Sequence, residues 1–316
     1  MNFKDKVKGL IFGQAIGDAL GLGAEFMSKE EVIYHYPNKL NNYNQIIQDK
    51  HRSRWKKGAW TDDTDQFLCI LDSILENKEV VLSDIAKRFY AWFKGTPMGI
   101  GRTTYSVLSV PQYTLYPTKA AELVWKMKRG NVASNGSLMR NSIVGAWNFN
   151  NMGNALADSE NICELTHFVQ RCKDSCKIMT AMIVNELNNI SFKWDNIENI
   201  IDPIDQRVKD YINRIENVTL TNLDLGSKID MGYTLKALSA GIWAYFNSNS
   251  FSDGLLKIIN EGGDADTNGC IAGSILGTKF GFSSIPIHWI DGLNGKELLE
   301  EKVNLLLDIL KLRFNK

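Results

Sequence analysis

The chain has 316 residues, of which 44% are hydrophobic, and its 36 Lys and Arg residues balance 36 Asp and Glu residues. This length is compatible with one large globular domain, which we expect to span residues 1–316. The charge balance leaves no overall field for a polyanion or an acidic membrane, so it disfavours nucleic acid and membrane partners. The sequence contains no apolar run of about 18 residues, and its charged N-terminal segment does not resemble a secretory signal.

Apolar residues recur at helical spacing from Phe67 to Leu75 and again from Leu235 to Phe246, whereas alternating, strand-like runs are scarce. Gly, Asn, Asp and Pro separate these segments, without a fixed-period repeat or a low-complexity linker. The Asn-rich stretch 185–199 indicates a helix end followed by a surface loop. Together these patterns predict an all-α fold.

The first conspicuous segment is a Gly-rich stretch over residues 9–21. Its glycines Gly13, Gly17 and Gly21 are four residues apart, which is typical of close helix packing. Asp18 on the same predicted helix is either a buried structural acid or a support for a metal site, and the pattern favours neither. Glu25 follows the stretch and, judged by residue type alone, would be a surface residue.

Three carboxylates and two hydroxyls are crowded into Thr61-Asp62-Asp63-Thr64-Asp65, just before a helical apolar run. Asp and Thr oxygens cap helix N-termini, so the cluster is a candidate cap. Neighbouring Asp62 and Asp63 repel one another, however, and an oxygen-bound cation would stabilise them together. On its own the segment is equally compatible with a cap and with a metal site.

Five cysteines, an odd number scattered along the chain, do not fit a disulfide framework, and we expect a cytoplasmic location. Cys172 and Cys176 lie four residues apart on a predicted helix. Because no Cys or His pair is nearby, burial explains them better than a metal or redox role.

A second acidic cluster, Gly262–Gly269, again places two carboxylates and a Thr together, and small residues at helical spacing follow it. Neither cluster offers a Cys or His ligand, so oxygen-only coordination favours Mg²⁺ or Mn²⁺ over Zn²⁺. The spacing of an EF-hand is absent. Two such clusters brought together from distant parts of the chain would form a shared site for two metal ions.

The segments Thr61–Thr64 and Gly263–Thr267 resemble the two metal-binding signatures of the ADP-ribosylglycohydrolase family, which includes the enzyme that reactivates dinitrogenase reductase. Residues 9–21 are similar to the family's first motif, and Asn135–Arg140 resembles the loop that cradles the ADP-ribose phosphates. The pairs Thr166-His167 and Gly232-Tyr233 match further steps of the nucleotide cleft. These matches occur in family order and cover nearly the whole chain.

This resemblance implies a compact, orthogonal helical bundle with a central cleft that holds two Mg²⁺ ions, with Mn²⁺ as an alternative. It implies metal ligation by Thr61, Asp62, Asp63, Asp264, Asp266 and Thr267. It implies catalytic roles for Glu25, Asp62, Asp63 and Asp266, and substrate binding by Asn135, Gly136, Ser137, His167 and Tyr233.

Three other positions are interpreted more plainly. Without the resemblance, Asn135–Ser137 would be an ordinary turn and His167 a core or surface histidine. Arg140 is interpreted as structural, because backbone groups carry most of the phosphate contacts in such loops. The remaining histidines, His35, His51 and His288, carry no motif and are interpreted as structural.

The implied reaction is hydrolysis of the bond between ADP-ribose and a modified acceptor, which is a protein side chain or a small molecule. A catalytically silent ADP-ribose-binding protein and a dinuclear nucleotide phosphohydrolase are the alternatives, and intact metal signatures argue against the first. In the segment Gly99–Thr104, members that reactivate dinitrogenase reductase carry an Asp where Gly99 stands here. This departure leaves the acceptor open among arginine, serine, a nucleobase, guanidine and small metabolites.

Overall fold

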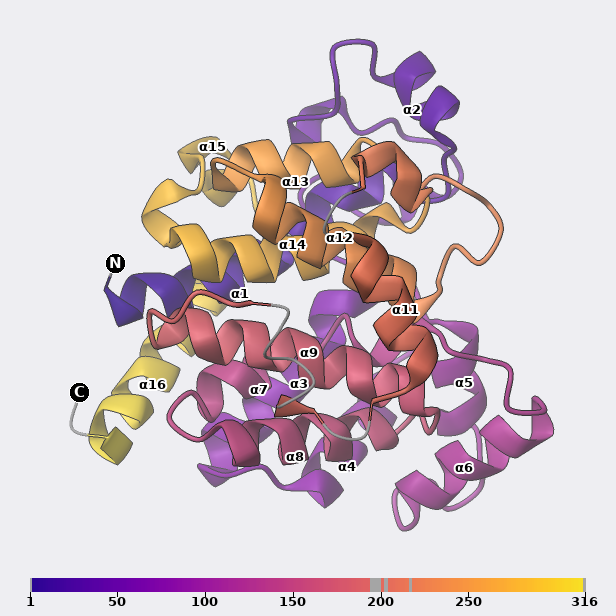
Figure 1. Ribbon diagram of the computed structural model, residues 1–316, viewed down its shortest axis with the longest axis vertical. Helices are drawn as coiled ribbons and strands as arrows, with labels where there is room; N and C mark the ends of the chain where they lie inside the picture. The colour runs from indigo at the N-terminus through magenta and orange to yellow at the C-terminus, as the bar shows by residue number, and fades with distance from the viewer. Residues whose placement is uncertain (1, 194–199, 202–203, 216–217, 315–316) are drawn as a thin grey trace.

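The computed structural model describes residues 2–193, 200–201, 204–215 and 218–314, and these ranges contain helices but no strand. An isolated antiparallel bridge joins Ser134 to Tyr233. The predicted all-α fold is therefore confirmed (Figure 1). The helices are α1 (Phe3–Gly21), α2 (Lys29–His35), α3 (Asp62–Asn77), α4 (Leu82–Lys94), α5 (Arg102–Leu108), α6 (Pro117–Met127), α7 (Ser142–Trp147), α8 (Met152–Glu164), α9 (Gln170–Leu187), α11 (Gln206–Ile215), α12 (Thr234–Asn247), α13 (Phe251–Ile259), α14 (Ala265–Phe280), α15 (Ile287–Asp291) and α16 (Lys296–Phe314).

Helices α1 and α14, from opposite ends of the chain, form the central antiparallel pair (Figure 1). Their backbones touch at glycines: a Cβ added to Gly13 would lie 2.1 Å from the carbonyl oxygen of Gly273, and one added to Gly17 would lie 2.0 Å from that of Gly269. No side chain fits at such distances. The glycine spacing in the first segment therefore serves close helix packing, as the sequence predicts.

The apolar periodicity identified both long helices correctly. Phe67, Ile70 and Leu71 of α3 are fully buried, and α3 contacts both α1 and α14. In α12, Leu235 and Leu238 are buried, and the helix packs against α14 and α13. Helix α9 ends at Leu187, inside the Asn-rich stretch, whereas residues 194–199 of that stretch lie outside the described residues.

The antiparallel arrangement positions the functional segments. Because α1 runs against α14, the C-terminal end of α1 meets the N-terminal end of α14, where Gly21 faces Ala265. Helix α3 begins close by, since Asp18 of α1 bonds to its first turn. The two acidic clusters and the segment that contains Glu25 therefore converge on one end of the central helix pair.

All five cysteines are free thiols, and Cys163, Cys172, Cys176 and Cys270 are buried. The expectation that Cys172 and Cys176 are simply buried is met by their position on α9. Among the described helices, none is both long and apolar enough to cross a membrane.

Candidate active site

Asp18 positions the first acidic cluster. Its Oδ1 accepts hydrogen bonds from the backbone N–H and the hydroxyl of Thr61, both at 2.9 Å, and its Oδ2 accepts from the backbone N–H and hydroxyl of Thr64, at 2.9 and 2.6 Å. Asp18 thus caps α3 from a neighbouring helix. Burial raises its pKa to about 7, although these hydrogen bonds oppose the shift. Asp18 is both a buried structural acid and the support of the cluster.

The cap leaves Thr61 and Asp63 with free lone pairs. The Thr61 hydroxyl gives its proton to Asp18, so its oxygen can still accept or ligate. Asp63 is buried, and its Oδ1 has no hydrogen-bond partner among the described residues. Asp65, in contrast, accepts from the indole N–H groups of Trp60 and Trp92 at 3.0 and 3.1 Å. The third carboxylate of the cluster therefore anchors side chains and does not face the cluster.

The second cluster is shaped by backbone geometry. Gly262 and Gly263 adopt positive φ values of 77° and 72°, which let the chain turn sharply before α14. Gly263 donates its N–H to the carbonyl of Met27 and accepts from the N–H of Phe26, both at 2.7 Å. Glu25 directly precedes Phe26, so these two backbone hydrogen bonds hold Glu25 close to the start of α14. Oxygen atoms of Glu25, Asp264 and Asp266 all lie within 4.8 Å of one another.

The carboxylates repel one another strongly. Loss of solvation, followed by the charges of Asp18 and Glu25, raises the pKa of Asp62 to about 8. Burial and the Glu25 charge raise the pKa of Asp264 to about 6. Burial and neighbouring carboxylates likewise raise the pKa values of Asp63 and Asp266 well above the usual range. Without a cation, the cluster therefore holds protons near neutral pH.

Glu25 has a partner that the sequence did not reveal. Its Oε2 lies 2.6 Å from Nε2 of His51, and the other ring nitrogen, Nδ1, lies 2.6 Å from Nη2 of Arg54. An arginine only donates, so Nδ1 must accept, and the neutral ring then carries its proton on Nε2 and donates it to Glu25. His51, which the sequence analysis interprets as structural, therefore holds the Glu25 carboxylate through a hydrogen bond.

The Asn135–Ser137 turn is tied to the second cluster. Asn135 donates its side-chain amide to Oδ2 of Asp264 at 2.7 Å, and its backbone N–H donates to the carbonyl of Gly232 at 3.0 Å. Tyr233 follows Gly232, and its hydroxyl accepts from Arg171 at 2.9 Å. The turn and the Gly232-Tyr233 step therefore lie side by side, next to the carboxylates.

Gly136 and Ser137 face different surroundings. A Cβ at Gly136 would lie 3.2 Å from Cε1 of His167 and 3.2 Å from the Thr104 hydroxyl, so the backbone approaches both closely. Ser137 is fully buried, and the thiols of Cys163 and Cys176 lie 3.3 and 3.6 Å from its hydroxyl. Any contact of Ser137 with a ligand would therefore come from its backbone.

His167 sits in a directed chain of hydrogen bonds. Arg140 donates to the Thr166 hydroxyl at 2.5 Å, and that hydroxyl lies 2.7 Å from Nδ1 of His167. Nε2 of His167 is 2.9 Å from the Ser134 hydroxyl, which in turn donates to Thr103. Burial, then the charges of Arg140 and Lys128, lower the pKa of His167. His167 is thus a neutral donor from Nε2 at the edge of the Asn135 turn.

Arg140 is fully buried, as a structural residue would be, but its partners are neutral. Its Nη1 donates to the side-chain oxygen of Gln66 at 2.5 Å, and its guanidinium lies 4.2 Å from the centre of the Phe89 ring. Gln66 then donates to Oδ2 of Asp62 at 3.1 Å. Together with Thr166, these contacts connect the first acidic cluster to the turn that carries Asn135.

The family model for ADP-ribosylglycohydrolases matches residues 1–315. This chain belongs to the ADP-ribosylglycohydrolase family. It is 27% identical over 300 residues to the ADP-ribosylarginine hydrolase Tri1 of Serratia proteamaculans, covering 93% of this chain and 76% of that protein. It is 24% identical to the ADP-ribosyl dinitrogen reductase glycohydrolase of Rhodospirillum rubrum, covering 97% and 95% of the two chains.

A solved structure titled as an ADP-ribosylglycohydrolase-related protein complex matches with a TM-score of 0.78 and 22% sequence identity, over 97% of this chain and 98% of that chain. This likeness shows the fold. The family membership shows that the protein is an enzyme that hydrolyses ADP-ribose glycosidic bonds.

In this ADP-ribosylglycohydrolase, the predicted site residues come together from distant segments. Thr267 lies close enough to the Asp63 carboxylate to oppose the rise of its pKa, so the starts of α14 and α3 lie side by side. The contacts that sequence reasoning missed are those that His51, Gln66 and the Ser134 hydroxyl make with Glu25, Asp62 and His167. His51 gave one signal, its place in a strongly basic stretch shortly before Thr61. Gln66 and Ser134 gave none, because a single polar residue in or beside a helix is common.

Proposed function

We propose that this enzyme removes ADP-ribose from a modified acceptor with two divalent cations, Mg²⁺ or Mn²⁺. One observation carries the proposal: Oδ1 of Asp63 and Oδ1 of Asp266 are buried and have no hydrogen-bond partner within the described residues. Buried carboxylate oxygens without partners are costly unless they bind a cation. Every candidate donor is an oxygen atom, which suits a hard cation.

The two clusters divide the proposed ligands between them. The start of α3 contributes one set and the start of α14 the other, and the 4.8 Å group of Glu25, Asp264 and Asp266 supports a cation on the α14 side. Asp18 and Gln66 would hold the α3 ligands from behind through their hydrogen bonds. The proposed ligands are Thr61, Asp62, Asp63, Asp264, Asp266 and Thr267.

The reaction breaks the bond from C1 of the distal ribose to the acceptor nitrogen or oxygen. Water supplies the hydroxyl that C1 receives and the proton that the acceptor receives, through a transition state that resembles an oxocarbenium ion. When bound, the cations would hold the ribose hydroxyls and lower the pKa of the attacking water. We assign the proton transfer to Glu25, with Asp62, Asp63 or Asp266 as the alternative group. His51 keeps the Glu25 carboxylate in place.

ADP-ribose would occupy the cleft beside the Asn135 turn. Backbone groups of the turn would contact the phosphate oxygens, and Gly136 has no side chain because His167 and Thr104 lie close on its Cβ side. His167 and Tyr233 would line the same cleft, and Ser137 would contribute its backbone. Asn135 couples the bound nucleotide to the α14 cluster through Asp264.

The acceptor is proposed to be an ADP-ribosylated protein or small molecule. Two relatives carry names that refer to ADP-ribosylarginine and to dinitrogen reductase, which makes arginine-linked ADP-ribose the first acceptor to test. Gly99 lies close to Asp62, since a Cβ at Gly99 would be 2.7 Å from Oδ1 of Asp62. The acid that some family members carry at this position would stand directly beside the metal ligands.

Mass spectrometry of a panel of ADP-ribosylated acceptors, with Mg²⁺ and with a chelator, tests the proposal. We expect free ADP-ribose from at least one acceptor, loss of release with the chelator and recovery when Mg²⁺ is added back. Full turnover in metal-free protein would contradict the two-cation site. Release of AMP in place of ADP-ribose would indicate a phosphohydrolase.

A further inference from the structure

The loop that precedes the first acidic cluster is strongly basic. Residues 50–57 contain Lys50, His51, Arg52, Arg54, Lys56 and Lys57, in a chain whose positive and negative charges balance overall. Arg52 is buried and is used internally, because it bonds to Asp49 and to the carbonyl groups of Gly23 and Glu25. The side chains of Lys50, Arg54, Lys56 and Lys57 are exposed.

Some exposed cations of this protein form ion pairs, whereas others, such as Lys78 and Lys87, form none within the described residues. Lys126, Lys257 and Lys296 each form an ion pair with a neighbouring carboxylate. Among the described residues, by contrast, no carboxylate lies within ion-pair distance of Lys50, Arg54, Lys56 or Lys57. No described carboxylate neutralises their charge, although Arg54 donates to His51 and Met98 and Lys57 donates to the carbonyl of Asn44.

The basic loop lies beside the catalytic carboxylate. Arg54 donates to Nδ1 of His51, and His51 donates to Glu25. Arg54 also donates to the carbonyl of Met98 at 2.9 Å, which joins this loop to residues 95–101. Exposed Lys94 and Arg102 flank that second loop, again without an ion pair in the described chain. We call the six cations Lys50, Arg54, Lys56, Lys57, Lys94 and Arg102 the basic rim.

Apolar side chains are interspersed with the basic rim. Phe26 and Met98 are each 53% exposed, far more than large apolar residues normally are. Phe26 also holds a left-handed backbone conformation, with φ of 62°, directly after Glu25. Its ring centre lies 5.0 Å from that of His51. An exposed aromatic ring is thus fixed next to the candidate catalytic group.

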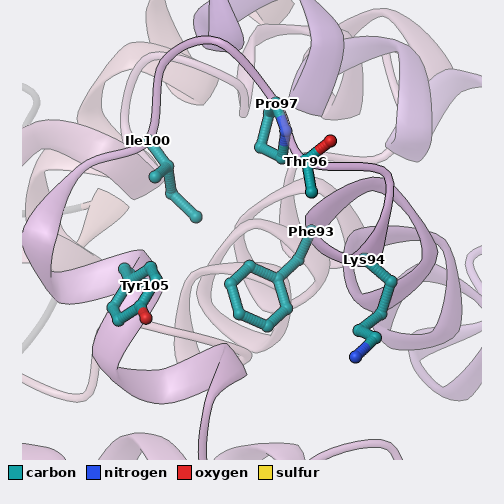
Figure 2. Close-up of a pocket in the computed structure, with 6 residues that line it drawn as sticks. All are labelled: Phe93, Lys94, Thr96, Pro97, Ile100 and Tyr105. Carbon is teal, nitrogen blue, oxygen red and sulfur yellow. The ribbon is translucent and has the colours of Figure 1, made fainter.

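A pocket borders the 95–101 loop, because Thr96, Pro97 and Ile100 line it. Figure 2 shows Phe93 and Tyr105 with Ile100 and Pro97 around an open space of about 310 Å³. The two aromatic rings meet edge to face, with centres 5.6 Å apart. Lys94 lies at the border of this space (Figure 2). The pocket is large enough for an apolar side chain and adjoins the basic rim.

We propose that the basic rim and this pocket bind the acceptor, and that the acceptor is a protein segment rich in Asp and Glu around the ADP-ribosylated residue. The inference rests on the proposed function and names its substrate class. The Asn135 turn, where the nucleotide is proposed to bind, contacts Asp264, whereas the basic rim contacts Glu25 through His51, so the acceptor would approach from the side of Glu25. Unpaired cations around that opening attract carboxylates.

An acidic protein segment fits these observations better than a nucleic acid. A single-stranded nucleic acid is bound in a groove whose cations follow the backbone over several nucleotides. Here the cations flank two short loops, alternate with apolar side chains and belong to a chain without net charge. Aromatic and arginine side chains of this kind are typical of protein interfaces.

The test compares short peptides that carry one ADP-ribosylated residue flanked by glutamates or by lysines, at low and high salt. The variant Lys50→Glu, Lys56→Glu, Lys57→Glu reverses the basic rim without touching the proposed catalytic groups. Its control, Lys126→Glu, Lys257→Glu, Lys311→Glu, changes the net charge equally at other helices. We expect the wild type and the control to favour the glutamate peptide about tenfold in kcat/KM at low salt, and the rim variant to lose this preference.

A second readout does not depend on turnover. Fluorescence anisotropy measures how each protein binds the unmodified glutamate peptide, the lysine peptide and a single-stranded oligonucleotide of equal charge. The proposal is supported if the rim variant binds the glutamate peptide more weakly than the wild type and the control do. Equal binding of both peptides, an unaffected rim variant, or preferential binding of the oligonucleotide overturns it.

The proposed function and the proposed acidic acceptor can fail separately. If glutamate-peptide binding depends on the basic rim while no peptide yields ADP-ribose, the surface stands and the proposed function fails. If ADP-ribose is released equally from both peptides by wild type and rim variant, the proposed function stands and the acidic acceptor is wrong.

Discussion

At the start of α3, hydrogen bonds from another helix hold the carboxylates: Asp18 accepts from both the backbone and the hydroxyls of Thr61 and Thr64. At the start of α14, the hold comes from backbone shape. Gly263 has a positive φ, and the backbone of α1 rests directly on that of α14. The first arrangement can be weakened by removing a polar group. The second arrangement can be disturbed only by adding atoms where the two backbones are already in contact.

The largest effect is expected where α1 meets α14. In Gly17→Ala, the new Cβ would lie 2.0 Å from the carbonyl oxygen of Gly269, so the backbones must separate. We expect a loss of about 3 kcal/mol or more in the free energy of unfolding, measured by denaturant titration. Gly101→Ala is the matched control, because no atom lies within 4 Å of its added Cβ. Equal stability of the two variants would contradict the packing argument.

Asparagine substitutions distinguish the capping carboxylate from those proposed to bind cations. Asp266→Asn should abolish ADP-ribose release yet raise the melting temperature of the metal-free protein, because Asp266 must take up a proton when the chain folds, whereas an asparagine is neutral in both states. Asp18→Asn should lower the melting temperature, because an amide NH₂ cannot accept from Thr61 or Thr64. Thermal scans in chelator measure both changes.

Shifts of the same sign in Asp266→Asn and Asp18→Asn would show that the two carboxylates have the same role. Wild-type turnover in Asp266→Asn would remove this residue from the proposed ligands.

Glu25 faces the α14 cluster, and its substitution tests whether that cluster also carries the proton transfer. If it does, Glu25→Gln should lower kcat by about 10²–10⁴-fold while ADP-ribose still binds, because the amide keeps the shape but cannot exchange the proton. Calorimetry with ADP-ribose is the control for binding. A near-normal kcat for Glu25→Gln would assign the proton transfer to one of the aspartates.

The metal-free enzyme should lose stability as the pH rises. The folded pKa values of Asp264, Asp18 and Asp62, about 6, 7 and 8, exceed the unfolded value of 3.8. Between pH 4 and 8 the folded state therefore binds more protons than the unfolded state, so the free energy of unfolding falls as pH increases. We expect a fall of at least about 3 kcal/mol, which the shift of Asp264 alone would give, measured by denaturant titration in chelator. Saturating Mg²⁺ should abolish the fall, and a rise with pH would contradict the clustered carboxylates.

The sequence alone revealed much of the fold. The spacing of Phe67 to Leu75 and of Leu235 to Phe246 predicted α3 and α12, and the four-residue spacing of Gly13, Gly17 and Gly21 predicted a close helix contact. It could not identify α14 as the partner of α1. Complementary small residues on two helices show that both pack closely, but they do not show that they pack with each other.

The site was predictable where charge is concentrated and not where a contact depends on loop geometry. Two dense acidic clusters stand out in any sequence, because such repulsion needs compensation. His51 reaches Glu25 through a loop without a long helix, so neither periodicity nor spacing connects them. For Arg140 the burial was foreseeable, but its neutral partners Gln66 and Thr166 were not.

The smallest effects on binding are expected for substitutions in the turn whose Asn135 is hydrogen-bonded to Asp264 of the α14 cluster. Ser137→Ala removes a hydroxyl that is fully buried beside two thiols, so the affinity for ADP-ribose should change less than about twofold. Gly136→Ala adds a methyl group 3.2 Å from His167 and Thr104, where the neighbours must move by a few tenths of an ångström. We expect its affinity for ADP-ribose, measured by calorimetry, to fall about fivefold.

This pair separates two ways in which the turn can bind phosphate. If backbone groups contact the phosphate, the distance between the backbone and the phosphate determines the affinity, and only Gly136→Ala weakens binding. A larger loss for Ser137→Ala than for Gly136→Ala would mean that the Ser137 hydroxyl turns away from Cys163 and Cys176 when ADP-ribose binds. In that case the turn would rearrange when ADP-ribose binds. The α14 cluster, which Asn135 contacts through Asp264, would not rearrange, because the backbones of α1 and α14 are already in contact.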